Sequence, residues 1–403
     1  MTTLTGMTWR HPRGHDSLLA ATAAFSAERP DVDVTWDARS LQDFADFPLS
    51  DLADRYDLLV VDHPFVGEAA ASGLLVPLDT VLSSGFLDDQ RRHSVGPSWR
   101  SYEWDGHQWA LAIDAACHVS VTRSDLVPEP PRDWAEVLRL ARALQVRGRS
   151  AVAVPAKPID AYLALVTLVA NDIGDPFRED GALADPRRTV AALEFLAELL
   201  ALCHPASLRS NPIELLELMT STDEVAYMPI TFGYVTYATP GARAHAVSFG
   251  PIPLGTRGSD GGALGGAGLG VSARSERIPE AVAFARFVAS GSVQGGAYVS
   301  GGGQPGYRSA WLDPAVNRCS GGFFAATLGG IDGSYLRPRW PGYLPAQTVA
   351  AEMVHAWLSR RDVPASGLVR ALDTHFVKAH GAAVARTGGG GSGSGSIKVK
   401  RER

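Results

Sequence analysis

The first 79 residues alternate between helical and extended patterns, and this order restricts the chain to an α/β architecture. A strand pattern at Leu4–Thr8 is followed by a helix that we expect to be capped by Asp16, and then by strands at Val32–Trp36 and Asp57–Val61. This β-α-β-β order favours a parallel sheet covered by helices. The third strand ends in Asp62. Because ligands bind at the carboxyl edge of strands in open α/β sheets, Asp62 is a first candidate for a binding residue.

Size and composition exclude several classes of protein. The chain has 403 residues, enough for two or three domains, and a formal net charge of −6, which argues against nucleic acid as a partner. Its three cysteines show no Cys-x-x-Cys spacing, so neither a zinc ribbon nor a redox motif is indicated. No segment approaches the ~18 apolar residues that a membrane span requires. We therefore expect no cofactor, no metal and no membrane span.

The two ends of the chain carry little fold information. Met1–Gly6 has neither the basic start nor the apolar core of a signal peptide. We expect a cytoplasmic protein as encoded, or an extracytoplasmic one if an export signal has been removed. Residues 387–403 form a Gly/Ser-rich linker and a basic tail, which the fold argument excludes.

The rest of the chain continues the alternation. A strand at Trp109–Ile113 is expected to end at Asp114, and Asp133 is expected to cap a helix that runs to Leu144. Val152–Pro155 is another expected strand. Further strands are predicted at 225–229, 247–251 and 269–271, and helices at 161–173, 189–202, 214–219, 279–290, 348–359 and 367–380.

Five short motifs, in a fixed order, resemble those of the extracellular solute-binding proteins of ABC transporters, family 1, the sugar-binding type. They are Tyr102–Leu111, Pro131–Val137, Asp223–Met228, Gly265–Val271 and Glu280–Val288. The resemblance covers roughly residues 4 to 385 and implies an α/β fold of the type II periplasmic-binding-protein class, in which a ligand cleft lies between two lobes that close by a hinge motion. We expect an N-terminal lobe of residues 1–112 plus 264–312 and a C-terminal lobe of residues 113–263 plus 313–386.

The resemblance also implies a function and partners. The chain would bind a small polar solute, a sugar or a sugar-like or organic acid, and deliver it to an ABC permease. We expect a monomeric binding protein without catalytic residues.

Residues at strand ends and in polar loops are the candidates for the cleft wall. Aromatic rings stack on sugar CH faces, Asp and Arg make charge-assisted hydrogen bonds, and glycines allow close backbone approach. The predicted ligand-binding residues are Trp9, Arg10, His11, Asp62, His63, Asp114, Phe232, Tyr234, Gly265, Gly266, Arg337, Trp340 and Tyr343.

Two other chemistries are weighed against binding. His11 and His15, four residues apart, suggest a metal pair, to which Asp16, His63, Asp114 and His118 could add ligands. Pro12, however, places the first histidine outside the helix. Asp62 and Asp114 could act as paired carboxylates of a hydrolase. The alternative function is therefore a cytoplasmic enzyme or pathway protein that reuses the solute-binding fold.

Overall fold

A computed structural model describes residues 1–39, 49–146 and 150–388 of the chain. The predicted linker and basic tail beyond residue 388 lie outside the described residues. The strands are β1 (Thr2–Trp9), β2 (Val32–Arg39), β3 (Leu58–Val61), β4 (Glu103–Trp104), β5 (His107–Gln108), β6 (Leu111–Thr122), β7 (Tyr227–Phe232), β8 (Ser248–Gly250) and β9 (Leu264–Val271). The helices that matter for the site are α1 (His15–Glu28), α3 (Leu49–Ala53), η1 (His63–Phe65), α4 (Val66–Ala71), α5 (Ser84–Arg92), α6 (Ser98–Ser101), α7 (Trp134–Val146), α8 (Pro158–Ile173), α9 (Pro186–Leu202), α10 (Pro212–Ser221), α12 (Ile278–Ala289), α16 (Phe323–Asp332), α17 (Tyr343–Arg360) and α18 (Ala365–Gly388).

Within the described residues, seven strands form one mixed sheet in the order β2-β1-β3-β9-β6-β7, with β8 paired to β6. The strands β1, β2 and β3 are parallel, as predicted. β9, however, runs antiparallel to both β3 and β6. The prediction of a parallel sheet is therefore right for the first three strands and wrong for the rest.

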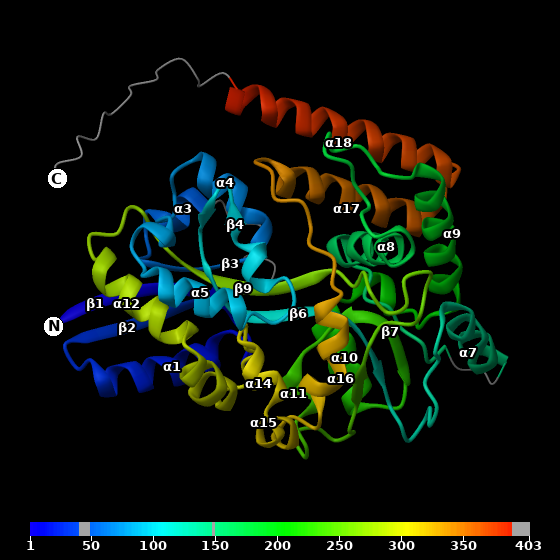
Figure 1. Ribbon diagram of the computed structural model, residues 1–403. Helices are drawn as coiled ribbons and strands as arrows, with labels where there is room; N and C mark the ends of the chain where they lie inside the picture. Colours follow the sequence, from blue (N-terminus) through cyan, green and yellow to red (C-terminus); the bar gives the residue numbers. More distant parts are fainter. Residues whose placement is uncertain (40–48, 147–149, 389–403) are drawn as a thin grey trace.

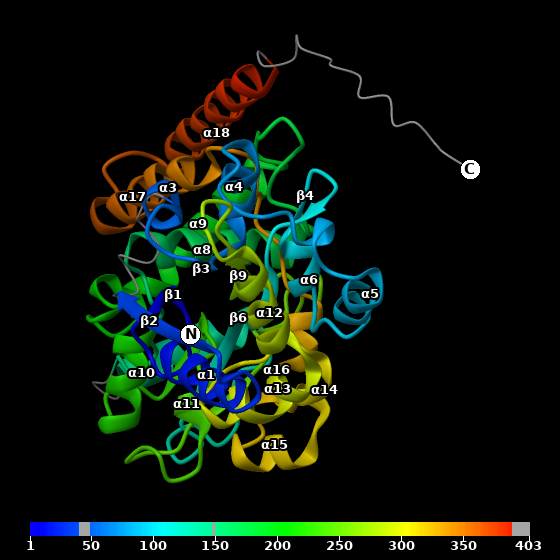
Figure 2. The ribbon, with the colours of Figure 1, turned by 90° about the vertical axis from the view of Figure 1, so that its left-hand side faces the viewer.

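The sheet supports two lobes (Figure 1). The first lobe is built on β1, β2 and β3, with α1 and α12 packed on one face and α3 and α4 on the other. The second lobe is built on the distal half of β6 with β7 and β8, and its helices include α8, α9, α17 and α18. In Figure 2, α17 and α18 lie at the top of the molecule and α14 (Arg308–Leu312) and α15 (Pro314–Cys319) lie at the bottom, with the strands between them.

Two strands pass from one lobe to the other. β6 pairs with β9 up to Cys117 and with β7 from His118 onward, while β9 pairs with β3 at its far end. All twelve residues of β6 are buried. A strand buried on both faces reads as a continuous apolar run rather than an alternating one. β6 and β9 thus link the two lobes, and the candidate residues gather beside them.

Several sequence predictions about single elements are wrong. Asp114 does not end a strand: β6 continues to Thr122, because Cys117–Val121 is also apolar enough to be buried. Val152–Pro155 contributes only an isolated bridge, from Val152 to Tyr227. Gly14, not Asp16, is the N-cap of α1, and Asp16 lies in its first turn. Tyr343 begins α17 rather than lying in a loop.

Candidate functional site

The loop after β1 sends its side chains in different directions. Trp9 is buried in the core of the first lobe, where its ring occupies the space that a Cβ at Gly14 would need. Arg10 is exposed, and its Nη2 donates to the Ala38 carbonyl at 3.2 Å, over β2. His11 is half-buried, and its ring lies edge-on to Tyr234 with the centroids 4.9 Å apart. Of the three candidates in this loop, the structure brings only His11 to the second lobe.

Arg13, in the same loop, makes the closest polar contact between elements of the two lobes. Its Nε donates to Asp114 Oδ1 at 2.9 Å, its Nη2 donates to Asp114 Oδ2, and its Nη1 donates to the Gly233 carbonyl at 3.1 Å. The guanidinium also lies over the Tyr234 ring, 4.9 Å from its centroid. The side chains of Arg13 and Asp114 are 5% and 0% exposed. A bidentate arginine–carboxylate pair therefore joins the β1 loop, β6 and the loop after β7.

Burial and charge set the protonation of this group. Burial raises the pKa of Asp114, and the Arg13 guanidinium opposes that rise. Burial alone would lower the pKa of Arg13, but the Asp114 carboxylate holds it above its ordinary value. Burial, with the Arg13 charge, lowers the pKa of His11 to about 4. His11 is therefore neutral near pH 7, and its Nδ1 accepts a hydrogen bond from the Arg13 backbone N–H at 3.1 Å.

Asp62 and His63 follow β3, as the sequence predicts, and meet the segment before α17. Arg337 Nη2 donates to both carboxylate oxygens of Asp62, at 2.6 and 2.8 Å, and Nη1 donates to Gln347 Oε1 at 3.3 Å. Burial would raise the pKa of Asp62, but the Arg337 charge holds it well below the ordinary value. His63 is fully buried, and burial and Arg337 lower its pKa to about 4. This second ion pair also joins the two lobes.

A third group lies where β6, β7 and β9 run side by side. His118 Nδ1 lies 2.7 Å from Thr167 Oγ1, and its ring centroid lies 4.3 Å from that of Phe232. Burial and the charge of Arg337 lower the pKa of His118 to about 3. Gly265 must lack a side chain, because a Cβ there would lie 2.7 Å from the Phe232 ring. The positive φ of Gly266, 99°, equally favours glycine.

Trp340 and Tyr343 belong to the packing of the second lobe. The Tyr343 hydroxyl lies 3.1 Å from that of Tyr162, and the side chain is fully buried. Trp340 packs edge-on against Tyr343 and His380. These contacts place both rings among α8, α17 and α18, and Arg337, three residues before Trp340, lies beside Asp62.

Two residues of the site were absent from the predicted set. Arg13 lies in the loop that supplied three candidates, and its place in that loop was the only signal that the sequence offered. His118 lies four residues after Asp114 on β6, and the period of two along a strand places residues separated by an even number on the same face. The expectation that β6 ends at Asp114 concealed this relation.

Comparison with known proteins identifies the group to which this arrangement belongs. The sequence model of one protein family, the bacterial extracellular solute-binding proteins, matches residues 12–295 of this chain. The chain is a member of that family. The sequence resemblance to solute-binding proteins is thereby confirmed.

Solved structures of solute-binding proteins share the fold along nearly the whole chain. Maltose-bound MalE3 of T. maritima has 18% identity and a TM-score of 0.80, over 94% of this chain and 99% of that one. A ribitol complex of an ABC transporter solute-binding protein from Agrobacterium radiobacter K84 has 18% identity and a TM-score of 0.80, over 94% and 98%. The predicted two-lobed periplasmic-binding-protein fold of type II is therefore confirmed.

A curated relative agrees over a shorter stretch. The maltotriose-binding protein of Pyrococcus abyssi is 25% identical over 124 residues, which are 31% of this chain and 26% of that protein. The matched stretch thus spans about a quarter of that relative.

Neither a metal centre nor a membrane span emerges from the described parts of the chain. Residues 1–39, 49–146 and 150–388 contain no group of three or more His, Cys, Asp or Glu side chains arranged to hold a metal ion. No helix in the same residues combines the length and apolar character needed to cross a bilayer. His11 lies outside the helix, as the sequence suggests, and its ring contacts Tyr234, whereas His15 is the first residue of α1.

Proposed function

We propose that this chain binds a neutral sugar or polyol between its two lobes and delivers it to an ABC permease. The observation that carries the proposal is the pairing of buried charges between the two lobes. Arg13 is bonded to Asp114 and Arg337 to Asp62, so each buried cation already has a carboxylate partner. An anionic ligand would have to compete with both carboxylates, whereas hydroxyl groups add hydrogen bonds without adding charge.

The aromatic and glycine residues support the same ligand class. His11, Tyr234 and Phe232 present ring surfaces from both lobes, and flat rings suit the apolar CH faces of a sugar. Gly265 lets the Phe232 ring, and Gly266 the backbone of β6, approach β9 closely. We assign these five residues, together with Asp62, His63 and Asp114, to the ligand-binding wall.

The family relatives support this choice. The solved neighbours include proteins in complex with maltose, ribitol and tagatose. These molecules carry several hydroxyl groups each and have no charge.

For the lobes we keep the predicted boundaries, residues 1–112 plus 264–312 and 113–263 plus 313–386. The apolar clusters favour a change of lobe within a few residues of the first boundary, since Ile113 packs with the first lobe and Ala115 with the second.

The enzyme alternative gains no support from the site. The two carboxylates that a hydrolase would use, Asp62 and Asp114, are each committed to an arginine. A general acid needs a carboxyl group that holds a proton near the working pH. Asp62 has its pKa held well below the ordinary value instead.

Isothermal titration calorimetry with maltose, ribitol, tagatose and gluconate tests the proposal. We expect at least one of the three neutral compounds to bind with one-to-one stoichiometry at the cleft, and gluconate to bind much more weakly. Phe232→Ala should weaken binding by about tenfold through the lost ring contact. Arg10→Ala, which alters an exposed side chain bonded over β2, is the matched control and should leave affinity unchanged. Tight gluconate binding with no binding of neutral compounds would contradict the proposal.

A further inference from the structure

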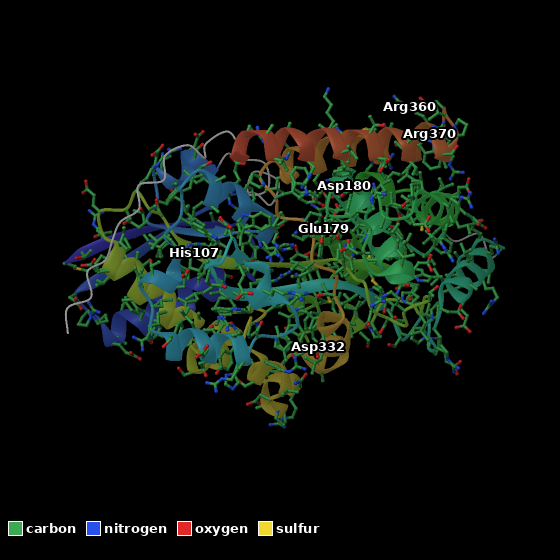
Figure 3. All side chains as sticks on the ribbon, turned by 45° about the horizontal axis from the view of Figure 1, so that its top comes forward. His107, Glu179, Asp180, Asp332, Arg360 and Arg370 are labelled. Atoms are coloured by element: carbon green, nitrogen blue, oxygen red, sulfur yellow. The ribbon has the colours of Figure 1, made fainter. Side chains whose placement is uncertain are left out.

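A cavity of about 440 Å³ lies on the first lobe, and its lining contains none of the residues assigned above to the ligand-binding wall. α5, α6 and the β4–β5 hairpin supply most of its wall, and Arg339 enters from the segment before α17. Figure 3 labels His107, one of the lining residues, among the blue and cyan elements of the N-terminal half. Sites for small molecules have volumes of about 300–1,000 Å³, so this cavity is large enough for a ligand.

Two tryptophans give the cavity fixed aromatic surfaces. Trp99 is 6% exposed, and its Nε1 donates to Glu103 Oε1 at 3.0 Å, which holds the ring in place. Trp104 is half-buried, and Arg339 lies over its ring with Cζ 5.8 Å from the centroid. Indole rings supply a large apolar contact at a low cost in conformational entropy. The cavity thus contains the flat surface on which a sugar ring can stack.

The cavity wall also contains an acceptor without a donor. Gln108 is 3% exposed, and its Nε2 donates to the carbonyl oxygens of Trp99 and Ala110, at 3.3 and 2.8 Å. These two bonds fix the orientation of the amide, and Gln108 Oε1 is left with no hydrogen-bond donor among the residues that the structure describes. A buried acceptor without a donor reduces stability.

The charges of the wall are nearly balanced. Asp79 accepts hydrogen bonds from His107 Nδ1 and the Gln108 backbone N–H, both at 2.9 Å. Arg91 Nη2 lies 3.8 Å from Glu103 Oε1, and Arg339 Nη1 donates to the Glu103 carbonyl at 2.6 Å. The wall therefore offers both donors and acceptors but no excess of positive charge. This pattern suits neutral hydroxyl groups, which both donate and accept, better than a phosphate or carboxylate.

We propose that this cavity is a second carbohydrate site, separate from the interlobe cleft, that binds a neutral mono- or disaccharide against Trp99 and Trp104. Glu103 accepts hydrogen bonds from its hydroxyl groups, and Arg91 and Arg339 donate to its oxygens. The inference rests on the cavity alone and does not depend on which solute the cleft binds.

Fluorine NMR on the full chain labelled with 5-fluorotryptophan tests the second site. A Trp104→Phe variant assigns the Trp104 signal, and maltose, ribitol and tagatose are titrated to millimolar concentration. We expect the Trp104 signal to shift in a saturable manner with at least one of these compounds. The signal of Trp134, which packs against Phe195 in the second lobe, should stay in place as the internal control.

Two further variants distinguish the cavity from the cleft. Glu103→Gln should weaken the saturable shift of the Trp104 signal by about tenfold and leave the calorimetric affinity of the cleft unchanged. Arg91→Ala provides a second, exposed change in case the first variant misfolds. Phe232→Ala, in the cleft, should leave the Trp104 shift intact. The proposal is wrong if none of the three compounds shifts the Trp104 signal, or if the shift disappears in Phe232→Ala, which would mean that it reports cleft closure.

Discussion

Replacing Asp62 by Asn should destabilise the protein strongly, because it leaves the buried Arg337 guanidinium without its counter-charge. Arg337 is 3% exposed and donates to both Asp62 oxygens, at 2.6 and 2.8 Å. Removing one partner of a buried ion pair costs about 3–5 kcal/mol. The asparagine oxygen retains one neutral hydrogen bond, and the Asp62 side chain is 25% exposed, so we expect a loss of about 2–3 kcal/mol in the free energy of unfolding.

Urea unfolding followed by tryptophan fluorescence measures this loss at pH 7. The matched control is Asp31→Asn, which breaks the ion pair with Arg29 on the surface, where the two side chains are 62% and 44% exposed. An exposed pair contributes little, so the control should be indistinguishable from the unaltered protein. If Asp62→Asn is as stable as the control, the pair does not hold the lobes together and the reasoning fails.

The pH dependence of the same difference gives a second check. The pKa of Asp62 is held below its ordinary value of 3.8 in the folded protein. A group with a lowered pKa contributes its full stability above the ordinary value and loses it as the pH falls toward the folded pKa. The difference between Asp62→Asn and the unaltered protein should therefore be constant from pH 8 to 5 and narrow only below about pH 4. A difference that changes between pH 8 and 5 would point to another group.

Three further changes test single features of the site and core. Gly266→Ala should cost at least about 2 kcal/mol in urea unfolding, because φ is 99° and a Cβ would overlap the Asp114 carbonyl oxygen, whereas Gly295→Ala has open space and should be near neutral. Burial lowers the pKa of His118 to about 3, so the free energy of unfolding should fall as the pH drops from 6.5 toward 4. His118→Asn should make the free energy of unfolding less dependent on pH in this range, and an unchanged dependence would contradict the prediction. Burial raises the pKa of Asp160 to about 7, so Asp160→Asn should raise the thermal midpoint more at pH 8 than at pH 5, and equal effects at both values would contradict it.

Local patterns were sufficient to predict the first three strands and the two site residues that follow β3. Asp62 and His63 were found because they directly follow a short apolar strand, and the carboxyl ends of parallel strands share one edge of a sheet. Periodicity identified α12, which begins at Ile278 with a proline in its first turn, and its buried face. Such features depend on neighbours within a few residues along the chain.

The remaining parts depend on contacts between distant residues. Arg13 and Asp114 are 101 positions apart, and no local pattern shows that they meet. The strand β6 was predicted too short because a strand buried on both faces loses the alternation that marks its length. Arg10 and Tyr343 have the residue types of a binding site, but the backbone turns one to solvent over β2 and the other into the core of the second lobe.

The ion pair of Asp62 also separates two ways in which a residue can act on ligand affinity. If Asp62 acts only by holding the lobes together, Asp62→Asn shifts the balance between open and closed forms and raises the Kd of every solute by the same factor. If Asp62 also accepts hydrogen bonds from the solute, the factor differs between maltose, ribitol and tagatose, because their hydroxyl groups are arranged differently. Since Asp62 is the more exposed partner of the pair, and both of its oxygens are shared with Arg337, we expect unequal factors. Calorimetry on Asp62→Asn, with each solute that binds, measures the increase in Kd. An equal increase for all solutes would mean that Asp62 acts on lobe closure alone.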